Sequence, residues 1–184
     1  MNAAVTDHYA REHQNWHWQV PAEMNVAQLC AHRWSRDPIR AVRPAIIWED
    51  EDGASDRVSF ASLSERVERF AAALSRLGVG AGDSVAVCLP QRIETAVSLL
   101  AVMHLGAIAV PLTVLFGPDA LEYRLGHAKC KVAIADGASL ANVLAVRARV
   151  PTLATVIACA GARDAAALDW DTLLAAETSG APLA

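Results

Sequence analysis

The chain has 184 residues, of which 54% are hydrophobic and 20% are charged, so it can bury a core and is not a disordered segment. The net charge of −4 argues against a nucleic-acid role, which normally needs a basic face. No window reaches the roughly 18 unbroken apolar residues of a membrane span, and the N-terminus lacks the apolar segment of a signal peptide. We expect a cytoplasmic protein.

Residues 1–24 are polar and aromatic without a steady period. We expect an arm that lies over the rest of the protein and is anchored by Trp16 and Trp18. His13 and His17 stand four residues apart, a spacing at which two histidines can share a metal on a helix. The string is HQNWH, without the glutamate of the HExxH motif, so a surface segment is favoured over a metal site.

A helix capped by Asn25 is predicted to run to about Trp34, with one side formed by Val26, Leu29, Cys30 and Arg33. The strands predicted at 45–48 and 57–60 form a hairpin around the acidic turn 49–53. Acidic turns can hold a hard cation, but the EF-hand spacing is missing, so a solvated turn is favoured.

A long helix is predicted from Ser62 to about Leu77, because Glu65 gives the capping-box spacing and an apolar stripe follows. The glycine cluster at 78–82 comes after this helix and opens a strand. A dinucleotide-binding fingerprint has the reverse order, so we exclude that interpretation. Asp83 is expected to orient the turn into the strand.

Short apolar runs begin near residues 84, 108, 131 and 155, and helical patterns lie between them. Gly106 directly follows the first of these helices, as a left-handed C-cap glycine does. Buried strands joined by helices are parallel with right-handed crossovers. This alternation of strands and helices predicts an α/β fold with a doubly wound, mainly parallel sheet and flanking helices. Asp169 is expected to cap a last short helix, and the tail SGAPLA to be loose.

The four cysteines are far apart and show no CxxC pairing, so we predict buried free thiols rather than disulfides or a metal site. They are Cys30, Cys88, Cys130 and Cys159.

Several strings occur in a characteristic order between residues 25 and 141. They are NVAQLCAHRW, AIIWEDEDG, VSFASLSERVERFAAALSRLGVGAGDSVAVCLPQ, LLAVMHLGAIAVPL and FGPDALEYRLGHAKCKVAIAD. This order resembles the N-terminal region of AMP-forming acyl-CoA synthetases, in particular the acetyl- and medium-chain enzymes of the adenylate-forming superfamily. The resemblance implies a partial AMP-binding subdomain at 25–184, which follows the arm expected at 1–24 from its composition.

The resemblance implies a two-step reaction for a complete enzyme. ATP and a carboxylic acid, such as a fatty acid, give an acyl-adenylate, and coenzyme A then takes the acyl group. Adenylation is needed because a carboxylate would have to expel oxide, and Mg²⁺ with basic groups offsets the phosphate charge. ATP, Mg²⁺ and coenzyme A are therefore implied for the full-length family.

The family's phosphate loop, rich in serine, threonine and glycine and ending in lysine, should follow the fourth strand. The sequence after Val156 contains nothing like it. The later adenine, ribose and acidic motifs are also missing, as is the domain with the catalytic lysine. We expect an incomplete subdomain with no catalytic residue, no metal ligand and no bound cofactor, which is inactive alone.

The resemblance places Phe116 and Gly117 at the mouth of the acyl and coenzyme A channel, with Arg124 nearby. From the residues alone, Phe116 can equally be a core residue and Arg124 can form a surface ion pair. In acetyl-CoA synthetases, arginines hold the nucleotide end of coenzyme A where this chain has Leu140 and Val143.

Three other roles remain open from the sequence. The chain can be half of a split synthetase whose partner chain carries the missing motifs, and it can also self-associate through an apolar face that it leaves uncovered. It can be a non-catalytic interaction module. It can also be a free-standing nucleotide-binding domain whose ligand sits at the strand carboxyl ends, near Pro90, Thr113 and Asp136, although no glycine-rich phosphate loop stands at those turns.

Overall fold

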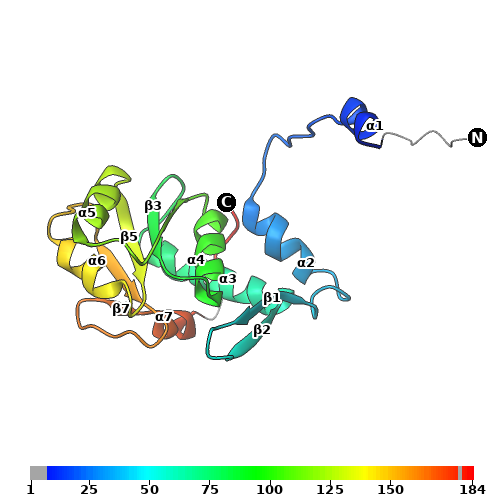
Figure 1. The fold of residues 1–184 in the computed structure, drawn as a ribbon. Coiled ribbons are helices and arrows are strands. Elements are labelled where there is room, and N and C mark those ends of the chain that lie inside the picture. The colour runs from blue at the N-terminus through cyan, green and yellow to red at the C-terminus, as the bar shows by residue number, and fades with distance from the viewer. Residues whose placement is uncertain (1–7, 178–179) are drawn as a thin grey trace, which may run out of the picture.

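The computed structural model describes residues 8–177 and 180–184 and is organised around a five-stranded parallel sheet (Figure 1). The strand order is β4-β3-β5-β6-β7, and each neighbouring pair runs parallel. The strands are β3 Ser84–Cys88, β4 Ile108–Leu112, β5 Cys130–Ala135, β6 Thr155–Ala158 and β7 Leu168–Asp169. The predicted doubly wound fold is confirmed, and the two-residue strand β7 is an addition that the sequence did not predict.

Helices cover both faces of this sheet, so there are two cores. The helices α3 (Phe60–Arg76), α4 (Ile93–His104) and α7 (Trp170–Ala176) belong to the first core. The helices α5 (Pro118–His127) and α6 (Leu140–Arg147) belong to the second. Successive residues of β3 serve opposite cores, because side chains alternate along a strand. Val85 and Val87 enter the first core, whereas Ala86 and Cys88 enter the second.

The chain before α3 forms an arm, one helix and a hairpin. The arm contains α1 (His8–Asn15). The π-helical turn η1 (Gln28–His32) continues into α2 (Arg33–Ser35), and the antiparallel hairpin consists of β1 (Pro44–Glu49) and β2 (Ser55–Ser59). The Asn25 cap is confirmed, since its Oδ1 accepts from the Ala27 N–H at 2.9 Å.

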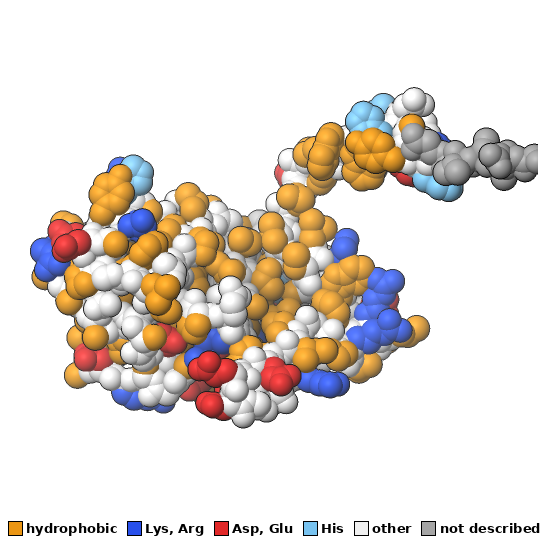
Figure 2. All heavy atoms as spheres, viewed as in Figure 1, with side chains coloured by type: hydrophobic (Ala, Val, Ile, Leu, Met, Phe, Trp, Pro, Cys, Tyr) orange, Lys and Arg blue, Asp and Glu red, His pale blue; other side chains and the backbone are white. Residues whose placement is uncertain are grey.

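The described part of the arm, residues 8–24, stands away from the body instead of lying over it (Figure 1). Trp16 and Trp18 are 65% and 83% exposed and contact each other edge to face at 5.9 Å. Figure 2 shows hydrophobic side chains along this arm with no part of the body against them. The expected tryptophan anchor is therefore wrong for these residues; residues 1–7 lie outside the described part of the chain.

Two helix predictions need correction. The helix α3 begins at Phe60 and not at Ser62, because the extended Ser59 is its cap and accepts from the Ser62 N–H at 3.2 Å. In the helix after Asn25, the inward residues are Ala27 and Ala31, whereas Leu29 is 38% exposed. The π-helical turn is not part of the regular 3.6-residue period from which the inward side was predicted.

Gly106 ends α4 as predicted, with φ +65°. Its N–H donates to the Met103 carbonyl at 3.1 Å, and the Ala107 N–H donates to the Val102 carbonyl at 3.1 Å. This pair of bonds is the Schellman motif, which needs a left-handed residue at this position. Two carbonyls at the end of α4 are thereby satisfied.

A buried chain of hydrogen bonds joins α3, α4 and the helix after Asn25 to the C-terminal tail. The His32 Nδ1 lies 2.6 Å from the Ser64 Oγ, and the His32 Nε2 lies 2.9 Å from the His104 Nδ1. The His104 Nε2 lies 2.9 Å from the Ala181 carbonyl oxygen. Both imidazoles are 2% exposed. Residues 180–184 are thus docked and not loose, whereas residues 178 and 179 are outside the described chain.

The direction of these bonds follows from the Ala181 carbonyl, which can only accept. His104 must therefore donate from Nε2, and in its neutral form it accepts at Nδ1 from the His32 Nε2–H. The His32 Nδ1 is then an acceptor for the Ser64 hydroxyl at 2.6 Å, in competition with the Glu68 Oε1, which lies 3.2 Å from the same hydroxyl. A proton added to His32 would go to Nδ1, which also faces the Glu68 Oε1 at 3.2 Å.

The Schellman geometry predicts that Gly106→Val lowers the free energy of unfolding by on the order of 1 kcal/mol or more, because a β-branched residue fits a positive φ badly. Urea denaturation measures this change. The control is Gly126→Ala, because Gly126 lies inside α5 with no atom within 4 Å of the added Cβ. That change should stabilise by roughly 0.5–1 kcal/mol. Equal stability of the Gly106→Val chain and the parent would refute the cap.

The histidine pair predicts a loss of stability at mildly acid pH. Burial, and secondarily the neighbouring His104, lower the pKa of His32. An unfolded histidine titrates near pH 6.5, so below about pH 6.5 the unfolded state binds more protons and the folded state loses stability. Thermal melts between about pH 8 and about pH 5 measure the slope.

Two variants identify which residue causes the dependence of stability on pH. His32→Gln should be less stable at pH 8 and should have a shallower slope. His127→Gln changes an exposed imidazole on α5 and should keep the parent's slope. If His32→Gln keeps the full slope, the proton uptake belongs to other groups.

Candidate functional site

The carboxyl ends of β3 and β5 form the topological switch point of the sheet. The chain passes from β3 to β4 on one side and then crosses to β5 on the other. In open α/β sheets, ligands bind in the crevice that such a reversal creates. Pro90 follows β3 and Asp136 follows β5, as the sequence predicted for this edge.

A charged cluster occupies this crevice. The Arg92 Nε lies 2.7 Å from the Glu94 Oε2, and one Arg92 terminal nitrogen lies 3.8 Å from the Asp136 Oδ2. Asp136 is 6% exposed. One guanidinium therefore faces two carboxylates, so the cluster carries an excess of negative charge and disfavours a phosphate group.

Ser139 closes the crevice between the two strands. Its hydroxyl donates to the Cys88 carbonyl at 2.7 Å and accepts from the Asp136 N–H at 3.2 Å. One buried side chain thus satisfies backbone groups at the ends of both β3 and β5. The position that binds ligands in related topologies is here filled by the protein's own hydrogen bonds.

A pocket of about 510 Å³ lies beside the crevice, at the carboxyl ends of β3 and β4. Leu89, Pro90, Leu112 and Thr113 are among its lining residues, and none of the lining side chains is charged. This pocket has the character of an apolar recess and offers no cation to a phosphate group.

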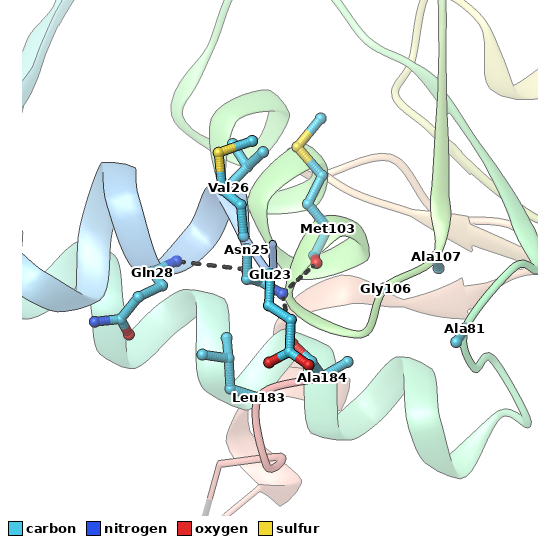
Figure 3. Close-up of a pocket in the computed structure, with 11 residues that line it drawn as sticks. Glu23, Asn25, Val26, Gln28, Ala81, Met103, Gly106, Ala107, Leu183 and Ala184 are labelled. Carbon is cyan, nitrogen blue, oxygen red and sulfur yellow. Dashed lines mark hydrogen bonds between the residues drawn. The ribbon is translucent and has the colours of Figure 1, made fainter. Parts of the chain in front are cut away.

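A second pocket, of about 780 Å³, lies at the opposite, amino edge of the sheet (Figure 3). It is bounded by the base of the arm, the end of α4 and the tail. The Asn25 amide points into this region and donates to the Met103 carbonyl at 2.9 Å and to the Ala184 carbonyl at 3.1 Å. Its amide hydrogens hold the tail, and the pocket is far from the switch point.

The predicted site residues Phe116, Gly117 and Arg124 come together at the start of α5. The Arg124 guanidinium carbon lies 4.1 Å above the Phe116 ring, and one of its terminal nitrogens donates to the Ala120 carbonyl at 3.1 Å. Gly117 is the exposed N-cap residue. Phe116 is half-buried against the second core. Among the described residues no carboxylate pairs with Arg124, so the ring contact replaces the surface ion pair.

The two positions at which the resemblance to acetyl-CoA synthetases led us to expect coenzyme A-binding arginines are apolar and buried here. Leu140 is 7% exposed and Val143 is 0% exposed, both in the second core. Nearby arginines are engaged by the protein itself. Arg147 donates to the Ala166 carbonyl at 2.8 Å, and the Arg149 Nε lies 2.6 Å from the Glu122 Oε2.

Lys131 lies at the amino edge of the sheet. Its Nζ is 3.1 Å from the Asp83 Oδ2 and also bonds the Gly78 carbonyl. The Asp83 carboxylate accepts from the Gly80 N–H at 2.9 Å, which confirms its predicted role in the turn. These two partners, the Gly80 N–H first, lower the pKa of Asp83.

All four cysteines are free, but only three are buried as predicted. Cys30 is exposed because its helix turns this side outward. Burial raises the pKa of Cys130 to about 11 and that of Cys159 to about 12, so both are thiols at neutral pH and weak nucleophiles. Cys159 directly follows β6.

Within residues 8–177 and 180–184, no three potential metal ligands of the His, Cys, Asp and Glu types come together. In the same part of the chain, no helix has the length and apolar character needed to cross a bilayer.

Sequence reasoning identified the edge of the crevice but missed Arg92 and Glu94. The available signal was an Arg-x-Glu string where α4 begins, directly after a buried strand. The link from Arg92 to Asp136 spans two strands and leaves no local pattern.

Comparison with known proteins shows what the chain is similar to. The acetyl-coenzyme A synthetase of Magnetococcus marinus is 38% identical over 122 residues, which are 65% of this chain and 19% of that protein. The acetyl-coenzyme A synthetase of Alkalilimnicola ehrlichii is 39% identical over 113 residues, 61% of this chain and 17% of that protein. The chain thus spans less than a fifth of these relatives.

Solved structures share the fold. The anthranilate CoA ligase AuaEII in complex with anthranoyl-AMP matches with a TM-score of 0.80 at 22% identity, covering 90% of this chain and 30% of that one. A Brucella canis acyl-CoA synthetase matches with a TM-score of 0.76 at 25% identity, covering 88% and 29%. The family model described as AMP-binding enzyme matches residues 37–182. The chain therefore belongs to the AMP-binding enzyme family.

Proposed function

We propose that this chain is the N-terminal structural portion of a synthetase that joins a carboxylic acid to coenzyme A at the expense of ATP, and that it does not catalyse adenylation alone. The family match over residues 37–182 carries the first part. The Arg92 cluster carries the second, because the crevice at the switch point presents paired charges and no free cation. We further propose a division into an arm at 1–24 and a subdomain at 25–184, and a cytoplasmic location.

The residues at the carboxyl edge do not fit a nucleoside triphosphate with its Mg²⁺. Arg92 is neutralised by Glu94 and Asp136. Lys131 is paired at the other edge of the sheet. A triphosphate in a poorly hydrated site needs preorganised donors and cations around it. ATP, Mg²⁺ and coenzyme A would thus have to bind mainly to groups outside this chain.

Phe116, Gly117 and Arg124 are the groups that we assign to the border of the acyl and coenzyme A channel in a complete enzyme. The stacked guanidinium supports this assignment, because its N–H groups are held near the protein surface by the ring contact and remain able to face an anion. The buried Leu140 and Val143 argue that any coenzyme A contact in this half uses Arg124 and not the segment after β5.

The proposal predicts that the purified 184-residue chain gives only background carboxylate-dependent exchange between ATP and pyrophosphate. The assay should cover short, medium and aromatic acids, because the chain does not fix the acid. Circular dichroism before each assay controls for folding. Exchange above background from this chain alone would overturn the proposed division of labour.

Adding a second polypeptide that carries the missing phosphate loop and C-terminal domain tests the first part of the proposal. Exchange that appears only in the mixture would establish a two-chain synthetase. A folded mixture that forms no complex and shows no exchange would favour a separate, non-catalytic interaction role. Binding of ATP by the isolated chain would instead favour a free-standing nucleotide-binding domain.

A further inference from the structure

We propose that residues 33–43, which comprise α2 and the turns after it, dock this protein onto an anionic phospholipid surface. This segment contains Arg33, Arg36, Arg40 and Arg43 against the single acid Asp37. Four arginines against one aspartate leave a net charge of +3 in a chain whose net charge is −4. Positive charge is therefore concentrated in one short segment.

Most of these guanidiniums lack a carboxylate partner. Asp37 pairs with Arg40 at 3.5 Å between the Nε and Oδ2 atoms. Throughout residues 8–177 and 180–184, no carboxylate forms an ion pair with Arg33, Arg36 or Arg43. An arginine that is not paired with a carboxylate of its own chain can bind phosphate oxygens, for which its planar fork of N–H groups is well suited.

The segment is held in a fixed shape before any contact is made. The Asp37 Oδ1 accepts from the Ile39 N–H at 2.9 Å and from the Arg40 N–H at 3.2 Å. The guanidinium carbons of Arg33 and Arg40 lie 4.1 Å and 4.4 Å from the Trp34 ring centre. Preorganised side chains lose less conformational entropy on binding.

Two aliphatic side chains protrude between the arginines. Ile39 is 69% exposed and Val42 is 76% exposed. Figure 2 shows basic and hydrophobic side chains together at this end of the body, below the arm. Protruding aliphatic groups surrounded by cations fit the boundary between acyl chains and headgroups, where apolar insertion and charge attraction add.

The acidic turn at 49–52 does not cancel this charge. It lies at the far end of β1, a strand of six residues, and a strand rises about 3.3 Å per residue. The separation of about 17–20 Å exceeds the Debye length of about 8 Å at physiological ionic strength. The basic segment can therefore meet an anionic surface while the acidic turn points away.

The same observations favour lipid over nucleic acid or an acidic protein. Bases would require an open aromatic face, but Trp34 is stacked with Arg33 and Arg40 and packs near Phe60 at 6.2 Å. Ile39 and Val42 are exposed, and neither of them lines the two pockets described above, at the two edges of the sheet. A bilayer needs no preformed recess in the protein, because the exposed aliphatic side chains can insert among its headgroups and acyl chains.

The test is co-sedimentation of the 184-residue chain with vesicles of phosphatidylcholine alone or with about one third phosphatidylserine. We expect about tenfold more bound chain on the anionic vesicles, and loss of most of this binding between about 0.05 M and about 0.5 M NaCl. Equal binding to both vesicle types, or no binding to either, would overturn the proposal.

Three double variants, each checked for folding by circular dichroism, locate the contact. Arg33→Glu with Arg43→Glu should reduce binding about tenfold or more. Arg149→Glu with Arg163→Glu makes the same change of net charge in the segments after α6 and after β6, and should leave binding within about twofold. If this control pair loses binding equally, only overall charge is involved and the assignment fails.

Ile39→Ser with Val42→Ser keeps every charge and removes the apolar tips, so it separates lipid insertion from charge attraction alone. We expect about a fivefold or greater loss of vesicle binding. Unchanged vesicle binding by this variant, with equal binding of the parent to RNA or a polyglutamate peptide, would show a general polyanion site and refute the lipid assignment.

Discussion

Burial of β3 on both faces is the constraint on which the rest of the structure depends. Val85 and Val87 require a helical layer on one side, and Ala86 and Cys88 require another on the opposite side. Only helices that return alternately to the two faces can satisfy both demands, and this gives the parallel order around the strand. A slip of one residue in β3 would exchange the two sets of side chains, so the register of its neighbours is fixed as well.

The regions read correctly from sequence are those in which local pattern and burial agree. The strands β3 and β4 are short apolar runs, and Gly106 ends the helix between them where the periodicity stops. The contact of His32 with His104 could not be predicted, because the residues are 72 positions apart and His104 stood on an apolar helical face. Trp18 was wrongly predicted to anchor the arm to the body. The residues next to a tryptophan in the sequence do not show which distant part of the chain, if any, its indole packs against.

For the candidate site, the sequence predicted the position of the crevice but not the side-chain pairing inside it. Topology alone predicted that Pro90 and Asp136 would border the crevice at the switch point. Side-chain pairing decided what the crevice can hold, and the two carboxylates around Arg92 leave it without a cation for phosphate. Phe116 and Arg124 are close in sequence, since one lies on a loop and the other on the helix that follows it. Their proximity could therefore be predicted from the sequence.

The docked tail has a consequence for the order of folding. The bond from Asn25 to the Ala184 carbonyl joins positions 159 residues apart, and closing a loop of that length costs about 4–5 kcal/mol of chain entropy when nothing else is formed. The local units around β3 can assemble without it, because their contacts are closer in sequence. We therefore expect the tail to dock after these units have formed. Until it does, the His104 Nε2–H has no acceptor from Ala181, and the surface of α3 and α4 beneath the tail stays open to solvent. Docking of the tail would then cover the outer surface of α3 and α4 after the sheet has formed.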